Sequence, residues 1–194
     1  IPSKALLEIS EFYDKINHKS KDYGIEANAV KINLDQLMGR KNKVVSQLTK
    51  GVEGLFKKNK VDWKKGSGTI LSKNKVLVKG ATEETLETKN ILIATGSVPK
   101  SFPGMEIDEK RVVSSTGALS FTEIPKHLIV IGAGVIGLEL GSVWRRLGSE
   151  VTFVEFAPMC VPTMDEELGK AIEKNMTKKG IKFHFGTAVS KINR

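Results

Sequence analysis

The feature that most constrains the fold of this chain is a glycine-rich hexapeptide, Gly132-Ala133-Gly134-Val135-Ile136-Gly137. Such a hexapeptide is a weak signal by itself, because glycine-rich segments also form turns. Here an apolar run at residues 128–131 precedes it, an amphipathic helical pattern at residues 135–147 follows it, and a second strand-like run ends in Glu155. This order of strand, glycine turn, helix and strand is typical of a Rossmann-type βαβ unit that binds a dinucleotide.

Each glycine of the hexapeptide has a mechanical reason. Gly132 permits a tight turn from strand to helix, Gly134 lets a pyrophosphate approach the backbone, and Gly137 lets the helix pack closely on the strand. Backbone N–H groups at the helix start, with the positive end of the helix dipole, would receive the phosphates. Because a glycine inside a helix costs about 0.5–1 kcal/mol relative to alanine, nucleotide binding explains the three glycines better than a βαβ unit without a ligand.

Glu155 indicates which nucleotide binds. It closes the second strand 23 residues after Gly132, close to the spacing of about 20 expected for the acid that contacts the ribose. A carboxylate there accepts hydrogen bonds from the ribose hydroxyls of NAD and repels the 2′-phosphate of NADP. Residues 156–164 contain no Lys or Arg that could receive that phosphate. The sequence therefore predicts NAD.

From residue 127 onward, strand and helix patterns alternate, which predicts a parallel sheet with right-handed crossovers. The expected strands are residues 127–131, 150–155 and 181–185, and the expected helices are residues 135–147 and 165–179, each followed by a glycine.

The first half of the chain has a different pattern. It predicts helices at residues 3–16 and 34–58, because apolar side chains recur there at helical spacing. Strand-like runs at residues 61–63, 69–71 and 75–78 predict a small antiparallel set. The continuous apolar run at residues 91–94 predicts a strand buried on both faces.

Composition excludes several classes of protein. The single cysteine, Cys160, rules out an internal disulfide and a cysteine-based metal cluster, and we expect no metal site. No apolar run approaches the roughly 18 residues that a membrane-spanning helix needs. The net charge of +9 is concentrated in residues 40–65, which contain nine Lys or Arg and only two acidic residues. Only Phe56 and Trp63 are aromatic there, so we expect a solvated helix face and no nucleic-acid partner.

Several motifs in this order resemble the two-dinucleotide flavoprotein disulfide reductases, the pyridine nucleotide-disulfide oxidoreductase family. The first is Ile91-Leu92-Ile93-Ala94-Thr95-Gly96-Ser97 ahead of the glycine hexapeptide, and others are residues 1–7, 113–119 and 139–144. The resemblance covers essentially the whole chain and is strongest to the branch that oxidises dihydrolipoamide. It implies an α/β fold with a Rossmann-like NAD-binding parallel sheet and part of a discontinuous FAD-binding domain. Residues 1–113 would be the later portion of the first FAD-binding segment, and residues 114–194 the start of the NAD-binding domain.

The resemblance also implies roles for individual residues. Lys4 would lie beside the flavin and pair with Glu139 near the nicotinamide. A cation there would stabilise negative charge on the reduced ring, and a carboxylate would offset the cost of burying that cation. The implied FAD contacts are Lys4, Gly68, Thr95, Gly96 and Ser97, and the implied NAD contacts are Gly132, Ala133, Gly134, Val135, Ile136, Gly137, Leu138, Glu139, Glu155 and Val189.

The implied reaction is the oxidation of dihydrolipoamide, carried on a lipoyl domain, with electrons passing through a disulfide and FAD to NAD. The implied protein is a homodimer in 2-oxo acid dehydrogenase complexes, in the mitochondrial matrix of a eukaryote or the cytoplasm of a bacterium. Its redox cysteines and its C-terminal interface domain with the acid–base histidine are expected outside this chain, which should be inactive by itself. Two alternatives stay open: a reductase of the glutathione or mercuric type, which Glu155 disfavours, and a short NAD-binding module without catalysis.

Overall fold

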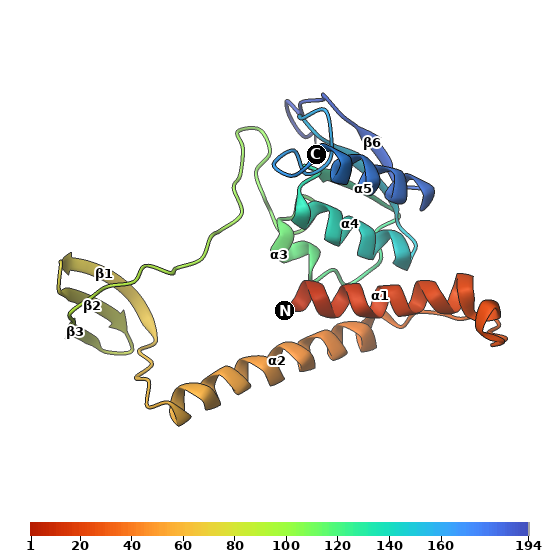
Figure 1. The fold of residues 1–194 in the computed structure, drawn as a ribbon. Helices are drawn as coiled ribbons and strands as arrows, with labels where there is room; N and C mark the ends of the chain where they lie inside the picture. Colours follow the sequence, from red (N-terminus) through yellow and green to blue (C-terminus); the bar gives the residue numbers. More distant parts are fainter. Residues whose placement is uncertain (194) are drawn as a thin grey trace. The chain divides into compact units, whose positions relative to one another are not determined.

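Figure 1 shows the fold as a computed structural model, in which residues 1–193 are described. The chain forms two compact units: the first combines Ile1–Val45 with Pro99–Arg194, and the second is Ser46–Val98. The long helix α2, Leu34–Lys58, runs through the boundary between them. Arg194, where the expected NAD-binding domain ends, lies outside the described residues.

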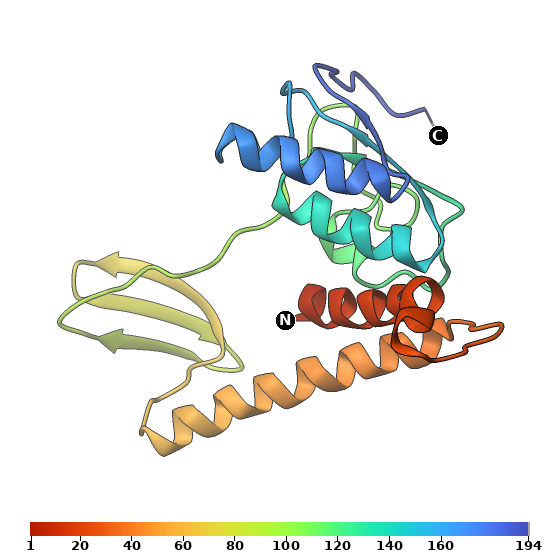
Figure 2. The same cartoon turned by 45° about the vertical axis from the view of Figure 1, so that its right-hand side comes forward.

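Three parallel strands form the sheet of the first unit, in the order β4-β5-β6. Helix α4 connects β4 to β5, and helix α5 connects β5 to β6; the two helices lie side by side in both ribbon views (Figures 1 and 2). This arrangement confirms the predicted α/β fold with a parallel sheet. The elements are β4 (His127–Ile131), α4 (Val135–Leu147), β5 (Glu150–Val154), α5 (Glu166–Lys178) and β6 (Lys182–His184).

Glycine ends both crossover helices, as the sequence predicts. Gly148 has a φ of +119° and Gly180 a φ of +78°, in the left-handed region that side chains disfavour. The guanidinium of Arg145, in the last turn of α4, donates from Nε to the carbonyl of Lys179 at 2.7 Å. The C-terminal ends of the two helices are therefore tied together.

The helices cover one face of the sheet through an apolar core. Phe153 of β5 stacks on Phe183 of β6 with ring centroids 5.0 Å apart. Gly141 lies so close to Phe153 that an added Cβ would collide with the ring, so α4 packs directly on the sheet. The buried members of this core are Ala133, Leu138, Val151, Phe153, Cys160, Val161 and Ile181.

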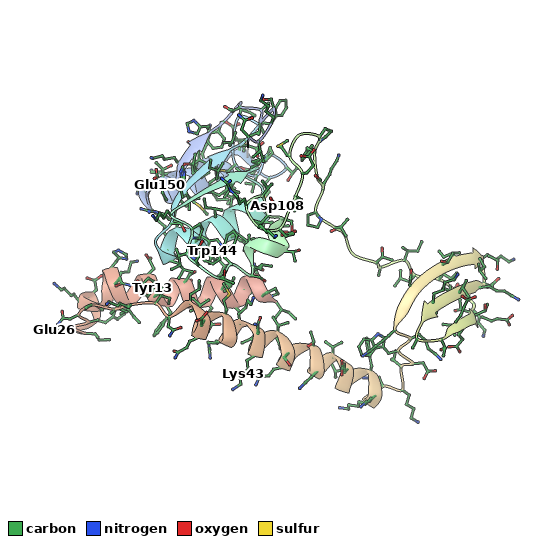
Figure 3. All side chains as sticks on the ribbon, turned by 180° about the vertical axis from the view of Figure 1, so that it is seen from behind. Tyr13, Glu26, Lys43, Asp108, Trp144 and Glu150 are labelled. Carbon is green, nitrogen blue, oxygen red and sulfur yellow. The ribbon has the colours of Figure 1, made fainter. Side chains whose placement is uncertain are left out.

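Helix α1 (Pro2–Lys19) packs against α4 through a second apolar cluster that includes Leu6 and Trp144. Trp144, labelled in Figure 3, is fully buried, and its indole N–H donates to the carbonyl of Ala118 at 3.0 Å. That carbonyl ends the short helix α3 (Ser115–Ala118). The 3₁₀-helix η1 (Ser20–Tyr23) continues α1. The N-terminal helix is thus part of the same unit as the glycine hexapeptide.

The second unit holds the rest of α2 and an antiparallel sheet of β1 (Gly66–Ser72), β2 (Lys75–Gly80) and β3 (Glu83–Glu87). The predicted antiparallel set is confirmed in kind but not in detail, because residues 61–63 form no strand and β3 was not predicted. β3 has a polar sequence, and its pairing with β2 supplies the strand that its residues alone do not indicate.

The prediction of a doubly buried strand at residues 91–94 is wrong for this structure. Leu92 is 90% exposed and Ile93 69% exposed, and the segment has no regular structure. A strand exists only where a neighbour satisfies its backbone N–H and C=O groups, and no strand of the described residues pairs with this segment. Apolar composition predicted the strand, but the partner decides whether it forms.

Candidate functional site

The glycine hexapeptide forms the turn between β4 and α4 in the first unit. Gly132 has a φ of +98°, and its N–H donates to the carbonyl of Val154 at 2.9 Å. A Cβ on Gly137 would collide with the carbonyl oxygen of Gly132 and press on Val130. Among the described residues, no heavy atom lies within 4 Å of a Cβ placed on Gly134. The turn is therefore closed where helix and strand meet and open where a ligand would approach.

The start of α4 presents unpaired backbone donors beside that open position. The first helical hydrogen bond runs from the N–H of Leu138 to the carbonyl of Gly134, so the N–H groups of residues 135–137 have no helical acceptor. The described structure gives this helix start no side-chain cap. Val135 and Ile136 are half to largely exposed. Free N–H groups at the positive end of a helix of 13 residues suit a phosphate group.

Glu155 lies directly after β5 and reaches the glycine turn. Its Oε2 accepts from the N–H of Ala133 at 2.6 Å, and its Oε1 accepts from the N–H of Ala157 at 2.6 Å. A carboxylate offers about four lone-pair positions, so acceptor capacity is left for two hydroxyl groups. The predicted proximity of Glu155 to the turn is present in the structure. Its two backbone hydrogen bonds were not predicted, because the sequence does not indicate which way the side chain folds.

Lys4 and Glu139 form an ion pair, although 135 residues separate them in the chain. Lys4 comes from the first turn of α1 and Glu139 from the first half of α4, and the packing of these two helices brings them together. The side chain of Lys4 is 72% exposed and that of Glu139 is 25% exposed. The pair therefore lies at the surface of this unit, with the carboxylate more deeply placed than the ammonium group.

The other predicted contacts belong to other segments of the chain. Gly68 lies in β1 of the second unit. Thr95, Gly96 and Ser97 lie in the exposed irregular segment of the same unit, where Gly96 has a φ of +75°. Val189 is partly buried in the segment that follows β6 in the first unit. Within one unit, the structure thus brings together Lys4 with Glu139, and Glu155 with the glycine turn.

Cys160 lies in the loop that follows Glu155, and its side chain belongs to the apolar core under the sheet's helices. Its thiol is fully buried, and burial, followed by the nearby carboxylates of Glu173 and Glu155, raises its pKa to about 11. The thiol is therefore protonated at neutral pH and has little nucleophilic character. This environment agrees with an unreactive structural cysteine.

Across residues 1–193, no group of three or more His, Cys, Asp and Glu side chains is arranged to hold a metal ion. None of the helices in the described chain combines the length and apolar character needed to span a bilayer.

One residue near the turn was missed by the sequence interpretation. Val161 donates its backbone N–H to the carbonyl of Ala133 at 3.0 Å, and it has a φ of +43°. Its only signal in the sequence is the following Pro162, which restricts the backbone of Val161 without revealing its conformation.

The family described as "Pyridine nucleotide-disulphide oxidoreductase" matches residues 1–194. Leghemoglobin reductase of Vigna unguiculata is 54% identical over 191 residues, covering 97% of this chain and 36% of the relative. Mitochondrial dihydrolipoyl dehydrogenase of Pisum sativum is 53% identical over 191 residues, covering 97% and 38%. The corresponding protein of Schizosaccharomyces pombe is 50% identical over 198 residues, covering 100% and 39%.

Solved structures give the same picture of the fold. LpdA from Mycobacterium tuberculosis superposes with a TM-score of 0.90 at 21% identity, covering all of this chain and 43% of that structure. The HOCl-induced flavoprotein disulfide reductase RclA from Escherichia coli superposes with a TM-score of 0.77 at 25% identity, covering 98% and 40%. The chain therefore spans less than half the length of each of these relatives.

Proposed function

Because the chain belongs to the pyridine nucleotide-disulphide oxidoreductase family, we propose that it is the central part of a dihydrolipoyl dehydrogenase. The reaction is the NAD-dependent oxidation of dihydrolipoamide to lipoamide. When bound, FAD supplies two-electron transfer between a protein disulfide and the nicotinamide. The observation that carries this proposal is the carboxylate of Glu155 at hydrogen-bonding distance from the glycine turn.

The nucleotide is NAD. The carboxylate of Glu155 keeps acceptor capacity for the two hydroxyls of the adenosine ribose, and its charge opposes a 2′-phosphate. The open position at Gly134 and the N–H groups at the start of α4 receive the pyrophosphate. The remaining NAD contacts are Gly132, Ala133, Val135, Ile136, Gly137, Leu138 and Glu139, with Val189 on the adenine side.

Lys4 and Glu139 are the catalytic pair within this chain. The ammonium group of Lys4 stabilises negative charge that develops on the reduced flavin, because a fixed cation needs no reorganisation during the reaction. Glu139 orients Lys4 through their ion pair and would lie near the nicotinamide when NAD is bound. Since Lys4 is largely exposed in this unit, its charge is available to a bound group.

The FAD-binding part of the chain is residues 1–113, and the NAD-binding domain begins at residue 114. Gly68, Thr95, Gly96 and Ser97 contact FAD together with Lys4. The left-handed backbone of Gly96 and the absence of a side chain at Gly68 allow a cofactor to approach the main chain at these two positions.

The longer protein supplies what this chain lacks for turnover. The redox cysteines and the histidine of the acid–base pair lie outside residues 1–194, so this chain by itself is inactive. The full protein is a homodimer that acts on dihydrolipoamide carried by a lipoyl domain in 2-oxo acid dehydrogenase complexes. Relatives with mitochondrial names in Pisum sativum and Schizosaccharomyces pombe, and a bacterial one in Pseudomonas putida, support a mitochondrial matrix or bacterial cytoplasmic location.

A comparison of nucleotides tests this function on the full-length protein. The purified flavoprotein should reduce NAD⁺ with dihydrolipoamide and show little activity with NADP⁺. A marked preference for NADP⁺ would favour a reductase of the glutathione or mercuric type. Binding of NAD⁺ without any dithiol oxidation would favour a non-catalytic NAD-binding module.

A further inference from the structure

Val161 has a backbone conformation that is sterically unfavourable for a β-branched residue. Its φ of +43° lies in the left-handed region, where the Cβ of an L-residue approaches the following carbonyl. Val161 is also β-branched, and it precedes Pro162, which further disfavours this backbone conformation. Such a residue persists only where its surroundings determine its conformation, and residues of this kind concentrate at functional sites.

The surroundings of Val161 hold it from several sides. Its N–H donates to the carbonyl of Ala133 at 3.0 Å, and its carbonyl accepts from the N–H of Met164 at 2.8 Å. The side chain is 3% exposed and belongs to the same core as Ala133. Gly169 of α5 lies so close to the carbonyl oxygen of Cys160 that an added Cβ would be 2.8 Å from it. The loop of residues 156–164 is therefore clamped between α5 and the glycine turn.

Glu155 and the loop that follows it bind both peptide groups of Ala133, the residue between Gly132 and Gly134. The N–H of Ala133 donates to Glu155, and its carbonyl accepts from Val161. The orientation of the Ala133 peptide fixes the direction of the chain as it enters α4. That direction in turn sets where the unpaired N–H groups of residues 135–137 point, because α4 begins at Val135.

We infer that Val161 is a positioning residue for the pyrophosphate of NAD, acting through the carbonyl of Ala133. This inference rests on the proposed dinucleotide site and adds to it a residue that does not itself contact the nucleotide. The left-handed conformation of Val161 directs its N–H at the turn, and the buried side chain holds that conformation. The function of the strained conformation is to keep the turn in its binding geometry before the ligand arrives.

Two substitutions at this position separate backbone positioning from side-chain packing. Val161→Ala removes the packing that holds the conformation but keeps the steric penalty of a Cβ, so the loop should leave the left-handed region. Val161→Gly removes the same packing and also the penalty, so the N–H can still reach Ala133. For an L-residue, the steric penalty of the left-handed conformation lowers the population of that conformation about five- to thirtyfold relative to an unstrained alternative. Glycine should therefore rescue what alanine loses.

The test is calorimetric titration of the full-length flavoprotein with ADP-ribose, which carries the pyrophosphate without the nicotinamide. Val161→Ala should weaken binding about tenfold, whereas Val161→Gly should stay within about threefold of the unchanged protein. The matched control is Val151 on β5, a fully buried valine of the same core. There alanine should leave the affinity unchanged, and glycine should lower the melting temperature more than alanine, since glycine weakens a strand interior.

Each outcome decides the inference. Equal affinity of Val161→Ala and the unchanged protein would overturn it, as would weaker binding by Val161→Gly than by Val161→Ala. If Val161→Ala does not fold, hydrogen exchange of the unchanged protein decides instead: the Val161 amide must be strongly protected before ligand is added, and fast exchange there overturns the inference. Failure of the unchanged protein to bind ADP-ribose would overturn the proposed function itself, which is a distinguishable result.

Discussion

Replacing Glu155 with glutamine changes one oxygen of its carboxylate to an amide nitrogen. Both oxygens accept from backbone N–H groups at 2.6 Å, one from Ala133 and one from Ala157. The amide side chain can accept from only one of these donors, and its NH₂ group would face the other. The substitution therefore removes a charge-assisted hydrogen bond at one end and turns it into a donor–donor contact.

The magnitude follows from those two contacts. A hydrogen bond to a charged group contributes about 1.5–3 kcal/mol, and a partly buried donor left unpaired costs about 1–3 kcal/mol. Since the loop can relax, we expect Glu155→Gln to lower the free energy of unfolding by about 2–3 kcal/mol. Loss of the ribose acceptor and of the charge should weaken NAD⁺ binding by about ten- to a hundredfold. NADP⁺ binding should weaken less, so the NAD⁺/NADP⁺ ratio falls.

The assay is titration of the full-length protein with NAD⁺ and NADP⁺, together with denaturant unfolding. Glu150→Gln is the matched control, because Glu150 begins the same strand and pairs with Lys182 at the surface. An exposed pair contributes about 0–1 kcal/mol, so stability should change little and both affinities should stay constant. An unchanged NAD⁺/NADP⁺ ratio in Glu155→Gln would refute the assignment of Glu155 to the ribose.

Gly137→Ala should disrupt the turn and lower the free energy of unfolding by about 2 kcal/mol or more, because its Cβ would collide with the Gly132 carbonyl. Gly134→Ala should leave the melting temperature unchanged but weaken ADP-ribose binding, because its Cβ enters open space. Equal effects of the two substitutions on binding and on stability would contradict this difference between the two glycines. Burial raises the pKa of Cys160 to about 11, above its value in the unfolded chain. The thiol's contribution of about 2–3 kcal/mol to the free energy of unfolding is therefore fully present below pH 8–9 and is lost as the pH rises toward 11. Cys160→Ala should show a smaller change in the free energy of unfolding over that pH range. Lys4→Met should change the free energy of unfolding by less than about 1 kcal/mol, because the ammonium group is largely exposed. The same substitution should sharply lower the rate of flavin reduction by dihydrolipoamide. Full activity of this variant would show that Lys4 is not part of the catalytic pair.

The sequence predicted the parts of the site that depend on local geometry. The glycine turn, the start of α4 at Val135 and the glycine after each crossover helix all follow from residues a few positions apart. The spacing to Glu155 also follows, because two parallel strands joined by one helix bring their carboxyl ends to the same edge of a sheet.

Contacts between distant segments could not be predicted from the residues that make them. The resemblance implied the pairing of Lys4 with Glu139, but only the packing of α1 on α4 brings the two side chains together. The strand expected at residues 91–94 illustrates the same limit. Its apolar residues are present, but no strand of the described residues pairs with them, so the strand does not form.

The sequence by itself determined that this chain contains a dinucleotide-binding βαβ unit with an acid at the end of its second strand. Only the tertiary structure decided that the acid binds two backbone N–H groups and that Val161 reaches the glycine turn in a left-handed conformation. The physical reason is that local backbone preferences oppose that conformation, and it exists because α5, the core and the turn together hold it in place.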